Sequence, residues 1–324
     1  MSNRSWVGIF VLLPSLAAAC TGAQTNRGPD SGPGPGPTDL PPPPVTAILV
    51  GAGDIADCTS VGADSGAHAE ATARLLDRMA YDVVFTAGDN AYFDGTAAQF
   101  ANCYAPRWGR HKSRTYPSPG NHEYQISSAP YFDYFGDRAG PRGAGFYSYN
   151  LGNWHIVSLN SNVAVSPSQE QYLWLKRDLD ANKSTFSKCN LAYWHHPLFT
   201  SGPSAGSNAL MRDIWQLLFE YGIDVVINGH DHLYERFAPQ TPGGLLSKQP
   251  GVAQFTVGTG GYFLFPIAGL APHSRALSDS SFGILTMRLR RGGLGWEFLD
   301  SPTSTPTDSG TLRCHNKVDL PHHR

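Results

Sequence analysis

Short apolar runs that are rich in β-branched residues recur along the chain between Val45 and about Asp300. Such runs, bounded by turn-forming residues, predict buried β-strands. They lie at Thr46–Val50, Val83–Thr86, Trp154–Leu159, Leu191–Trp194, Asp224–Ile227, Ala253–Val257 and Gly283–Leu289. Helical patterns alternate with them, at Ala67–Ala80, Ser168–Leu179 and Ala209–Tyr221. Alternating strands and helices indicate an α/β domain, which we expect over residues 45–300. The strand-rich later half indicates a second, mixed sheet.

The 324-residue chain carries few charges. Its 24 Lys and Arg residues nearly balance 26 Asp and Glu residues, and charged residues make up 15% of the chain, against roughly 25% in an ordinary soluble protein. A protein that binds nucleic acid electrostatically shows a basic patch or stripe, so the composition argues against such a surface. The 41% hydrophobic content is sufficient for a packed core.

The first twenty residues have the form of an export signal. Arg4 is followed by the apolar stretch from Trp6 to Leu13 and by small residues up to Cys20. This segment is too short to span a membrane, and it predicts export. Its end resembles a bacterial lipoprotein box, in which Cys20 becomes the lipidated N-terminus. We therefore expect a cell-surface or periplasmic lipoprotein held to the membrane by a lipid anchor, with ordinary cleavage and secretion as the alternative.

Two further segments are predicted to lie outside the folded core. Twelve of the seventeen residues from Gly28 to Pro44 are Gly or Pro. This composition forms neither a helix nor a sheet ladder, so residues 21–44 are predicted to be a disordered tether. Residues 301–324 are polar and rich in turn formers, and they are predicted to be a surface tail.

Four cysteines remain besides Cys20, and their spacings match no CxxC zinc or redox motif. An even number of cysteines in an exported protein predicts two disulfides, for which three pairings exist. We favour Cys58–Cys103 and Cys189–Cys314, because the first pair flanks one local stretch. Free buried thiols are the alternative.

Several predicted strands and turns lead directly into residues with metal-binding side chains. In open α/β sheets, ligands bind beyond the carboxyl ends of the strands. Five of the ten residues named below follow a Gly or precede a Pro, where the backbone can turn tightly. The motifs are ILVGAGD with Asp54, VVFTAGDNAY with Asp89 and Tyr92, PSPGNHEY with Asn121, His122 and Glu123, LAYWHHP with His195 and His196, and DVVINGHDH with His230 and His232.

These side chains offer carboxylate, amide, imidazole and phenolate donors. Such donors suit borderline and hard metal ions rather than a thiolate zinc site. They are too many for one ion, whereas two ions that share one carboxylate account for the whole set. Two ions about 3.5–4 Å apart stabilise the attacking and leaving oxygens of an in-line phosphoryl displacement.

Together, the five motifs resemble the calcineurin-like metallophosphoesterase superfamily, in order, from about Ala47 to Arg236. Many members have a His two residues after the first Asp, where this chain has Ala56. Instead, Tyr92 stands three residues after Asp89. That Tyr, together with GHDHLYER, is similar to the purple acid phosphatase branch, in which the phenolate binds a ferric ion.

The resemblance implies a fold, two cofactors and a role for each residue. The implied fold is a four-layer αββα sandwich of two mixed sheets flanked by helices. The first ion, Fe(III), would be held by Asp54, Asp89, Tyr92 and His232. The second, a divalent iron, zinc or manganese ion, would be held by Asp89, Asn121, His195 and His230. Asp89 bridges both ions and is counted as catalytic.

The other motif residues are implied to face the substrate. His122 would bind the substrate and either act as the general acid for the leaving group or stabilise the charge of the transition state. His196 would contact the phosphate, Asn121 would also lie on the substrate side, and Glu123 would orient His122 or shape the pocket.

The function predicted from these residues is that of an exported, dinuclear-metal phosphohydrolase. It would hydrolyse small-molecule phosphate monoesters, as an acid phosphatase does, by attack of a metal-bound hydroxide. A phosphodiesterase or nucleotidase that uses the same metals is one alternative. A surface binding protein that retains the fold without turnover is another.

Overall fold

A computed structural model describes residues 43–58, 66–182, 189–206, 208–247 and 250–315. The predicted export signal at residues 1–20, all but the end of the tether, and residues 316–324 of the tail lie outside the described residues. No helix of the described part of the chain is long and apolar enough to cross a membrane.

The first of two mixed sheets has the strand order β13-β12-β11-β1-β2-β3. Strand β1 pairs in parallel with β2, and β2 with β3, whereas β11, β12 and β13 add antiparallel strands beyond β1. The strands are β1 (Val45–Ala52), β2 (Val83–Ala87), β3 (Thr115–Ser118), β11 (Gly283–Arg290), β12 (Gly293–Asp300) and β13 (Pro306–Arg313).

The second sheet has the order β10-β8-β9-β7-β6-β5-β4. Its centre, from β5 through β6 and β7 to β9, is parallel, and antiparallel strands lie at both edges. The strands are β4 (Tyr147–Leu151), β5 (Trp154–Ser158), β6 (Cys189–Tyr193), β7 (Val225–Asn228), β8 (Tyr234–Phe237), β9 (Ala253–Val257) and β10 (Ser274–Ser278).

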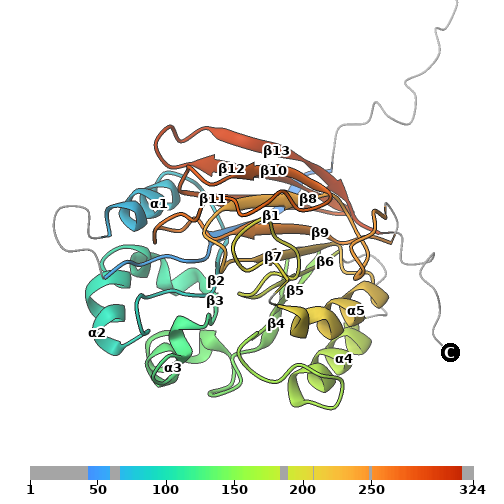
Figure 1. The fold of residues 1–324 in the computed structure, drawn as a ribbon, viewed down its shortest axis with the longest axis horizontal. Helices are drawn as coiled ribbons and strands as arrows, with labels where there is room; N and C mark the ends of the chain where they lie inside the picture. Colours follow the sequence, from blue (N-terminus) through green and yellow to red (C-terminus); the bar gives the residue numbers. More distant parts are fainter. Residues whose placement is uncertain (1–42, 59–65, 183–188, 207, 248–249, 316–324) are drawn as a thin grey trace, which may run out of the picture. The chain divides into compact units, whose positions relative to one another are not determined.

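Helices accompany both sheets (Figure 1). Helices α1, α2 and α3 lie on the side of β1 to β3, and α4 and α5 on the side of β4 to β7. Their bounds are α1 (Ala67–Asp77), α2 (Ala97–Gln99), α3 (Ala129–Phe135), α4 (Glu170–Asn182) and α5 (Arg212–Glu220). Short 3-10 or π segments occupy residues 100–104, 108–114, 122–124, 136–139 and 209–211. This arrangement confirms the predicted αββα architecture.

Alternation along the strands divides the core into two clusters. In β6, Leu191 and Tyr193 belong to the cluster that joins the two sheets, whereas Ala192 faces the helices. The helix-side cluster includes Leu175 of α4 and Trp215 of α5, both fully buried. Successive residues of a strand point to opposite faces, so each central strand is buried on both sides and reads as a continuous apolar run.

The end of the chain differs from the sequence prediction. Residues 301–324 were predicted to be a surface tail, but Pro306–Arg313 forms β13, the edge strand that pairs with β12. The sheet therefore extends beyond the predicted boundary at residue 300. Residues of β13 alternate between exposed and half-buried, and an edge strand with one solvated face needs few apolar side chains.

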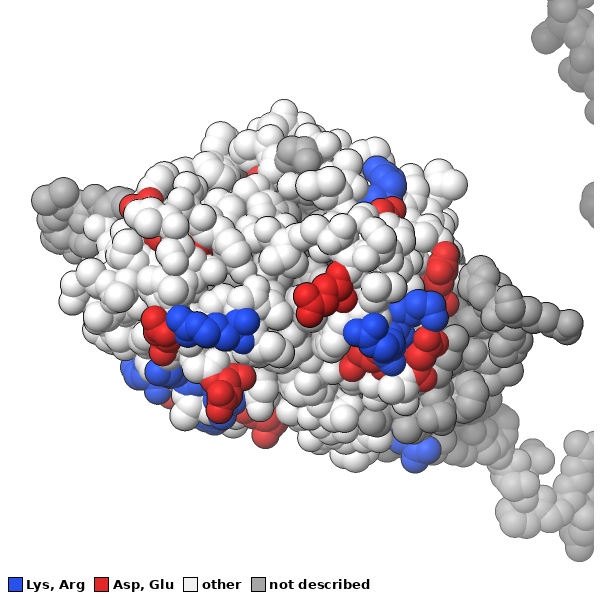
Figure 2. All heavy atoms as spheres, turned by 90° about the horizontal axis from the view of Figure 1, so that it is seen from below, with Lys and Arg blue, Asp and Glu red and all other residues white. Residues whose placement is uncertain are grey.

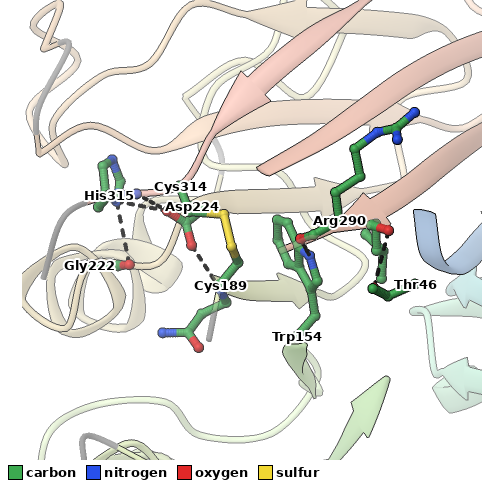
Figure 3. Close-up of a disulfide and its surroundings, with 10 residues drawn as sticks. Thr46, Trp154, Cys189, Gly222, Asp224, Arg290, Cys314 and His315 are labelled. Atoms are coloured by element: carbon green, nitrogen blue, oxygen red, sulfur yellow. Dashed lines mark hydrogen bonds and ion pairs between the residues drawn. A yellow bond between two sulfur atoms is a disulfide. The ribbon is translucent and has the colours of Figure 1, made fainter. Parts of the chain in front are cut away.

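Both favoured disulfide pairings are confirmed. Cys58 bonds to Cys103, across 45 residues of sequence, and Cys189 bonds to Cys314, across 125 residues. Figure 3 shows the second bond beside Asp224, whose carboxylate accepts the backbone N–H groups of Asn190 (2.8 Å) and His315 (2.6 Å). Cys189 begins β6 and Cys314 follows β13, so this disulfide ties the second sheet to the first.

The low charge of the sequence is visible on the molecular surface. On the face that Figure 2 shows, Lys and Arg lie next to Asp and Glu in mixed groups, and most of the face carries no charge. Exposed ion pairs of the described residues include Arg142 with Asp133 and Lys176 with Asp180. Exposed pairs of this kind contribute little to stability.

Candidate metal centre

The predicted ligands follow the carboxyl ends of strands from both sheets. In the first sheet, Asp54 lies two residues after β1, and Asp89 lies two residues after β2. In the second sheet, His195 lies two residues after β6, and His230 lies two residues after β7. Parallel strands present their carboxyl ends at the same edge, and the two sheets therefore deliver carboxylates and imidazoles to one place.

The backbone at three of these positions is left-handed. The φ angles are 60° at Asp54, 49° at Asp89 and 70° at His230. Non-glycine residues adopt this region uncommonly, and such strained positions cluster at functional sites. Gly88 and Gly120 lie directly against the cluster: a Cβ at Gly88 would collide with the His195 ring, and one at Gly120 would collide with the Asp89 carboxylate.

One ligand cluster surrounds the hydroxyl of Tyr92. Its oxygen lies 2.8 Å from Asp54 Oδ1, 3.0 Å from Asp89 Oδ2 and 3.1 Å from His232 Nε2. Tyr92 and Asp54 are completely buried, and His232 nearly so. Burial, together with the charges of Asp54 and Asp89, raises the pKa of Tyr92 well above its ordinary value.

A second cluster surrounds the ring of His195. Its Nδ1 lies 2.8 Å from the carbonyl oxygen of Ala87, which fixes the ring. Its Nε2 then lies 3.0 Å from Asn121 Oδ1, 3.1 Å from Asp89 Oδ2 and 3.2 Å from His230 Nδ1. Burial acts to lower the pKa of His195, but the charges of Asp89 and Asp54 outweigh it and raise that pKa to about 9.

The donor chemistry of both clusters fits cations. A tyrosine hydroxyl has one hydrogen, yet the Tyr92 oxygen faces three atoms that can accept. Around His195, two acceptor oxygens, Asn121 Oδ1 and Asp89 Oδ2, face Nε2, and this nitrogen carries a lone pair of its own whenever the ring is neutral and Nδ1 donates to Ala87. Such an excess of buried acceptors is satisfied by positive charge. Carboxylate, imidazole, amide and phenolate donors are those that borderline and hard metal ions use.

Asp89 belongs to both clusters. Its Oδ2 contacts Tyr92 in the first cluster and His195 in the second, while its Oδ1 accepts the backbone N–H of His122 at 2.9 Å. Burial raises the pKa of Asp89, but the facing His195 and His122 outweigh burial and hold that pKa below its usual range.

Two further imidazoles border the clusters. His122 Nδ1 hydrogen-bonds to the carbonyl oxygen of Phe93, and its Nε2 lies 3.8 Å from Asp89 Oδ2. His196 Nδ1 lies 2.7 Å from the Ser161 hydroxyl. Burial, followed by the charges of His195 and His230, lowers the pKa of His196 to about 2. Burial and the charge of His195 also lower the pKa of His230 to about 4.

Every residue predicted for the site is thus brought to one edge of the sheets. His196 lies directly beside the clusters. One of its ring nitrogens lies within 4.8 Å of a ring nitrogen of His195 and of one of His230. Which residue binds which ion remains a prediction.

The buried carboxylate of Glu123 organises the loops that carry the ligands. Its oxygens accept the backbone N–H groups of Asp89 (3.0 Å), Asn90 (2.7 Å), Ala91 (3.3 Å) and Gly120 (2.7 Å). Burial and the charge of Asp89 raise the pKa of Glu123, whereas the backbone N–H groups that its oxygens accept oppose this shift and favour the carboxylate. The Glu123 carboxylate therefore holds together the two loops that carry Asp89 and Asn121, through backbone bonds rather than through the His122 side chain.

Sequence reasoning missed a second buried carboxylate at the site. Asp231, between His230 and His232, accepts the Thr200 hydroxyl at 2.6 Å and the Ser204 hydroxyl at 2.7 Å. These bonds fix the turn that separates the two histidines. The missed signal was the position of Asp231 itself, since a carboxylate between two ligands in a tight turn is well placed to orient them.

Sequence reasoning also missed an aromatic segment at the end of β9. The Tyr262 ring stacks on Tyr92 at 3.7 Å between centroids, and the Phe265 ring stacks on His232 at 4.1 Å. This segment follows the carboxyl end of a strand, as the ligands do, and that position was the signal that could have identified it.

The fold and the site together define a class of protein: an αββα phosphoesterase scaffold with a metal-binding cluster at the carboxyl ends of its strands. The family model of the calcineurin-like phosphoesterases matches residues 49–234. The chain belongs to this family, and the predicted resemblance to the metallophosphoesterases is confirmed.

Relatives and solved structures support the purple acid phosphatase-like branch. The chain is 31% identical over 189 residues to purple acid phosphatase 15 of Arabidopsis thaliana, covering 48% of this chain and 36% of that protein. It is 27% identical over 206 residues to human acid phosphatase type 7, covering 55% and 46%. The matches thus span about a third to a half of these relatives.

The structural comparison agrees on the fold. The purple acid phosphatase PPD1 from yellow lupin (Lupinus luteus) seeds superposes with a TM-score of 0.68 at 20% identity, covering 84% of this chain and 55% of PPD1. GAP50, described as the anchor in the inner membrane complex of Plasmodium, superposes with a TM-score of 0.62 at 15% identity, covering 85% and 95%.

Proposed function

We propose that the chain is a dinuclear-metal phosphohydrolase that acts on phosphate monoesters. The observation that carries the proposal is the position of Asp89, whose Oδ2 lies 3.0 Å from the Tyr92 oxygen and 3.1 Å from His195 Nε2. One carboxylate therefore contacts both ligand clusters and is placed to be shared by two ions. Two ions that share a ligand are the arrangement used for in-line phosphoryl displacement.

In this proposal each cluster holds one ion. Asp54, Tyr92 and His232 would hold the first ion, Asn121, His195 and His230 would hold the second, and Asp89 would contribute to both. When bound, the ions supply positive charge to the phosphate oxygens and lower the pKa of coordinated water towards neutrality. The phenolate of Tyr92 favours Fe(III) at the first position, with divalent iron, zinc or manganese at the second.

The protein's own residues then position the ester and move a proton. His122 donates through Nδ1 to the carbonyl of Phe93, so its Nε2 is turned towards the cluster. As water oxygen bonds to phosphorus and the ester P–O bond breaks, a proton at His122 Nε2 passes to the leaving oxygen. His196, held by Ser161, contacts the phosphate.

The first test compares site variants on the full chain. His122→Ala and Asn121→Ala are each expected to lower kcat/KM for an aryl phosphate by about 10²–10⁴-fold, the contribution typical of a proton donor or of a metal-site residue. Asn150→Ala, at an exposed position of β4, is the matched control and keeps wild-type activity. Activity unchanged in either site variant contradicts the site assignment.

A second test addresses the metals. We expect two metal ions per chain by elemental analysis and a visible Tyr–Fe(III) charge-transfer band. Tyr92→Phe removes the phenolate but keeps the ring that stacks on Tyr262, so it is expected to lose the band while remaining folded. A band that persists in this variant rejects Tyr92 as an iron ligand.

The alternatives are separated by substrate. Faster turnover of a diester than of the matched monoester would favour the phosphodiesterase or nucleotidase. Two bound ions with no turnover of any phosphate ester would favour a surface binding protein.

We also propose export, which the two disulfides support because such bonds persist in oxidising compartments. Lipid mass on Cys20 in mass spectrometry tests the anchor.

A further inference from the structure

Two exposed phenylalanines border the candidate metal centre. Phe93 is 46% exposed and Phe263 is 49% exposed, and they are the phenylalanines among the large apolar side chains exposed in the described ranges. Each ring packs edge-on against a histidine of the site, Phe93 on His122 at 4.7 Å and Phe263 on His232 at 5.0 Å between centroids. Exposed apolar rings beside a reactive centre are available to a ligand.

The two rings are the ends of one continuous series of aromatic contacts. Phe93 touches His122, and His122 lies 4.5 Å from the Tyr92 ring. Tyr92 stacks on Tyr262 at 3.7 Å, and Tyr262 contacts Phe263 at 4.5 Å. Of the inner rings, Tyr92 and Tyr262 are buried and His122 is half-buried, whereas both ends reach solvent. Exposed apolar surface thus lies beside His122 at one end of this series and beside His232 near the other.

The charges around the cluster differ from those that a polyanionic substrate needs. The groups that shift the pKa values of Asp89, Tyr92 and His195 are carboxylates, imidazoles and backbone groups. Ion-paired Arg and Lys side chains of the described residues engage carboxylates outside the cluster, as Arg110 does with Glu70 and Asp77. Additional phosphate groups are usually held by Arg or Lys.

We propose, on the basis of the proposed function, that Phe93 and Phe263 form a clamp for the leaving group and select esters of flat aromatic alcohols. His122 hands its proton to the leaving oxygen, so the group attached to that oxygen lies beside His122. Phe93 is the ring next to His122 on its exposed side. An aromatic leaving group there covers apolar surface that a polyol or a second phosphate leaves in water.

The test uses three monoesters on the full, metal-loaded chain. Phenyl and 1-naphthyl phosphate share similar leaving-group chemistry but differ in aromatic area, and glycerol 2-phosphate has a polar leaving group. Phe93→Ala and Phe263→Ala are each expected to lower kcat/KM for 1-naphthyl phosphate by about three- to tenfold, chiefly through KM. The value for glycerol 2-phosphate is expected to change less than twofold.

A binding measurement supplies a readout that needs no turnover. In calorimetry, each alanine variant is expected to bind benzylphosphonate about three- to tenfold more weakly, with binding of methylphosphonate unchanged. Leu210→Ala removes an apolar side chain that is 79% exposed at residues 209–211 and serves as the matched control. Phe93→Leu restores apolar volume without a flat ring and should recover only part of the loss.

The outcomes separate the clamp from simpler roles. If Phe93→Ala slows all three esters equally, Phe93 only positions His122 and the clamp is rejected. If Phe263→Ala leaves the preference for naphthyl over glycerol esters unchanged, the clamp is also rejected, although the proposed function stands. A wild-type chain that hydrolyses no monoester rejects the proposed function, and the clamp with it.

Discussion

The two sheets meet at both ends of their parallel strands, and the two ends are built differently. At the carboxyl ends, buried polar groups join the sheets: His195 hydrogen-bonds to the carbonyl of Ala87, and Asp54 accepts the N–H of His230. At the amino ends, the sheets are joined by the Cys189–Cys314 disulfide. We call these regions the metal edge and the closure.

The closure is made of partners that satisfy one another. The Trp154 indole N–H of β5 donates to the carbonyl of Arg290 in β11 at 3.0 Å, and the Thr46 hydroxyl donates to Leu289 at 3.2 Å (Figure 3). Asp224 accepts two backbone N–H groups. Each of these polar groups has a hydrogen-bond partner, which is how buried polar groups are accommodated in a stable fold.

The metal edge lacks this balance. Hydrogen-bond acceptors outnumber donors around Tyr92 and His195. Three candidate ligands also have a left-handed backbone, namely Asp54, Asp89 and His230. We expect the metal edge to lower the stability of the fold and to favour the binding of cations. The closure is expected to raise the stability and to take no part in binding. Because proteins commonly store strain at functional sites and compensate elsewhere, mutations at the two ends should separate stability from activity.

The largest expected effect breaks the closure without touching the site. Replacing Cys189 and Cys314 together by Ser opens a loop of 125 residues, and the chain-entropy model assigns roughly 4–5 kcal/mol of unfolding free energy to such a bond. Denaturant unfolding measures the loss. Activity per folded molecule should stay within about twofold, because the bond lies at the opposite ends of the strands from the ligands.

The other disulfide is the matched control for this prediction. Cys58–Cys103 closes only 45 residues, and its loss is expected to cost about 4 kcal/mol on the same model. A double Ser variant at Cys189 and Cys314 that is stable but inactive would contradict the division between the closure and the metal edge.

The next effect comes from the metal edge. Glu123→Gln places an amide NH₂ against backbone N–H donors that now point at a carboxylate. The loops that carry Asp89 and Asn121 should shift, which we expect to lower kcat/KM and metal affinity by about 10–100-fold. Elemental analysis and steady-state kinetics measure both, and Glu170→Gln on helix α4 is the control. A variant that keeps its metals and its activity would show that Glu123 supports only the fold.

The sequence predicted the central strands, and it pointed to the candidate ligands that gather at the site, because both leave local signals. Apolar runs mark strands that are buried on both faces, and the ligands follow those runs at glycine- or proline-flanked turns. The short strand β3 was missed because Pro117 argues against a strand. The proline is tolerated because β3 lies at the edge of the first sheet. Strand β13 was missed because its outer face is polar.

The supporting contacts of the site left no such signal. The carboxylate of Glu123 reaches backbone groups about thirty residues earlier in the chain, at Asp89 to Ala91. Asp231 bonds to Thr200 and Ser204 across another loop. Contacts of this kind depend on how the strands are ordered in the sheets. Local patterns do not encode that order, although the disulfide pairing was predicted because one pair flanks a single stretch.

The smallest expected effect tests whether the first sheet is also held to the second through its edge. Asp308 of β13 accepts the Tyr234 hydroxyl (2.7 Å), the Arg236 guanidinium (2.7 and 3.0 Å) and the Trp296 indole N–H (3.1 Å). Tyr234 and Arg236 belong to β8 of the second sheet. Asp308→Asn should therefore lower the unfolding free energy by about 1.5 kcal/mol near pH 7, with activity unchanged.

The pH dependence of this loss identifies its cause. Burial raises the pKa of Asp308, but Arg236 and the other donors outweigh burial and hold that pKa below its ordinary value near 3.8. A carboxylate with a lowered folded-state pKa stabilises the protein above its unfolded-state pKa, and the contribution is lost as the pH falls. The difference between wild type and Asp308→Asn should thus be constant from about pH 5 to 8 and shrink below about pH 4. A difference that persists undiminished at pH 3 would mean that the carboxylate charge contributes nothing, and that the edge is held by packing alone.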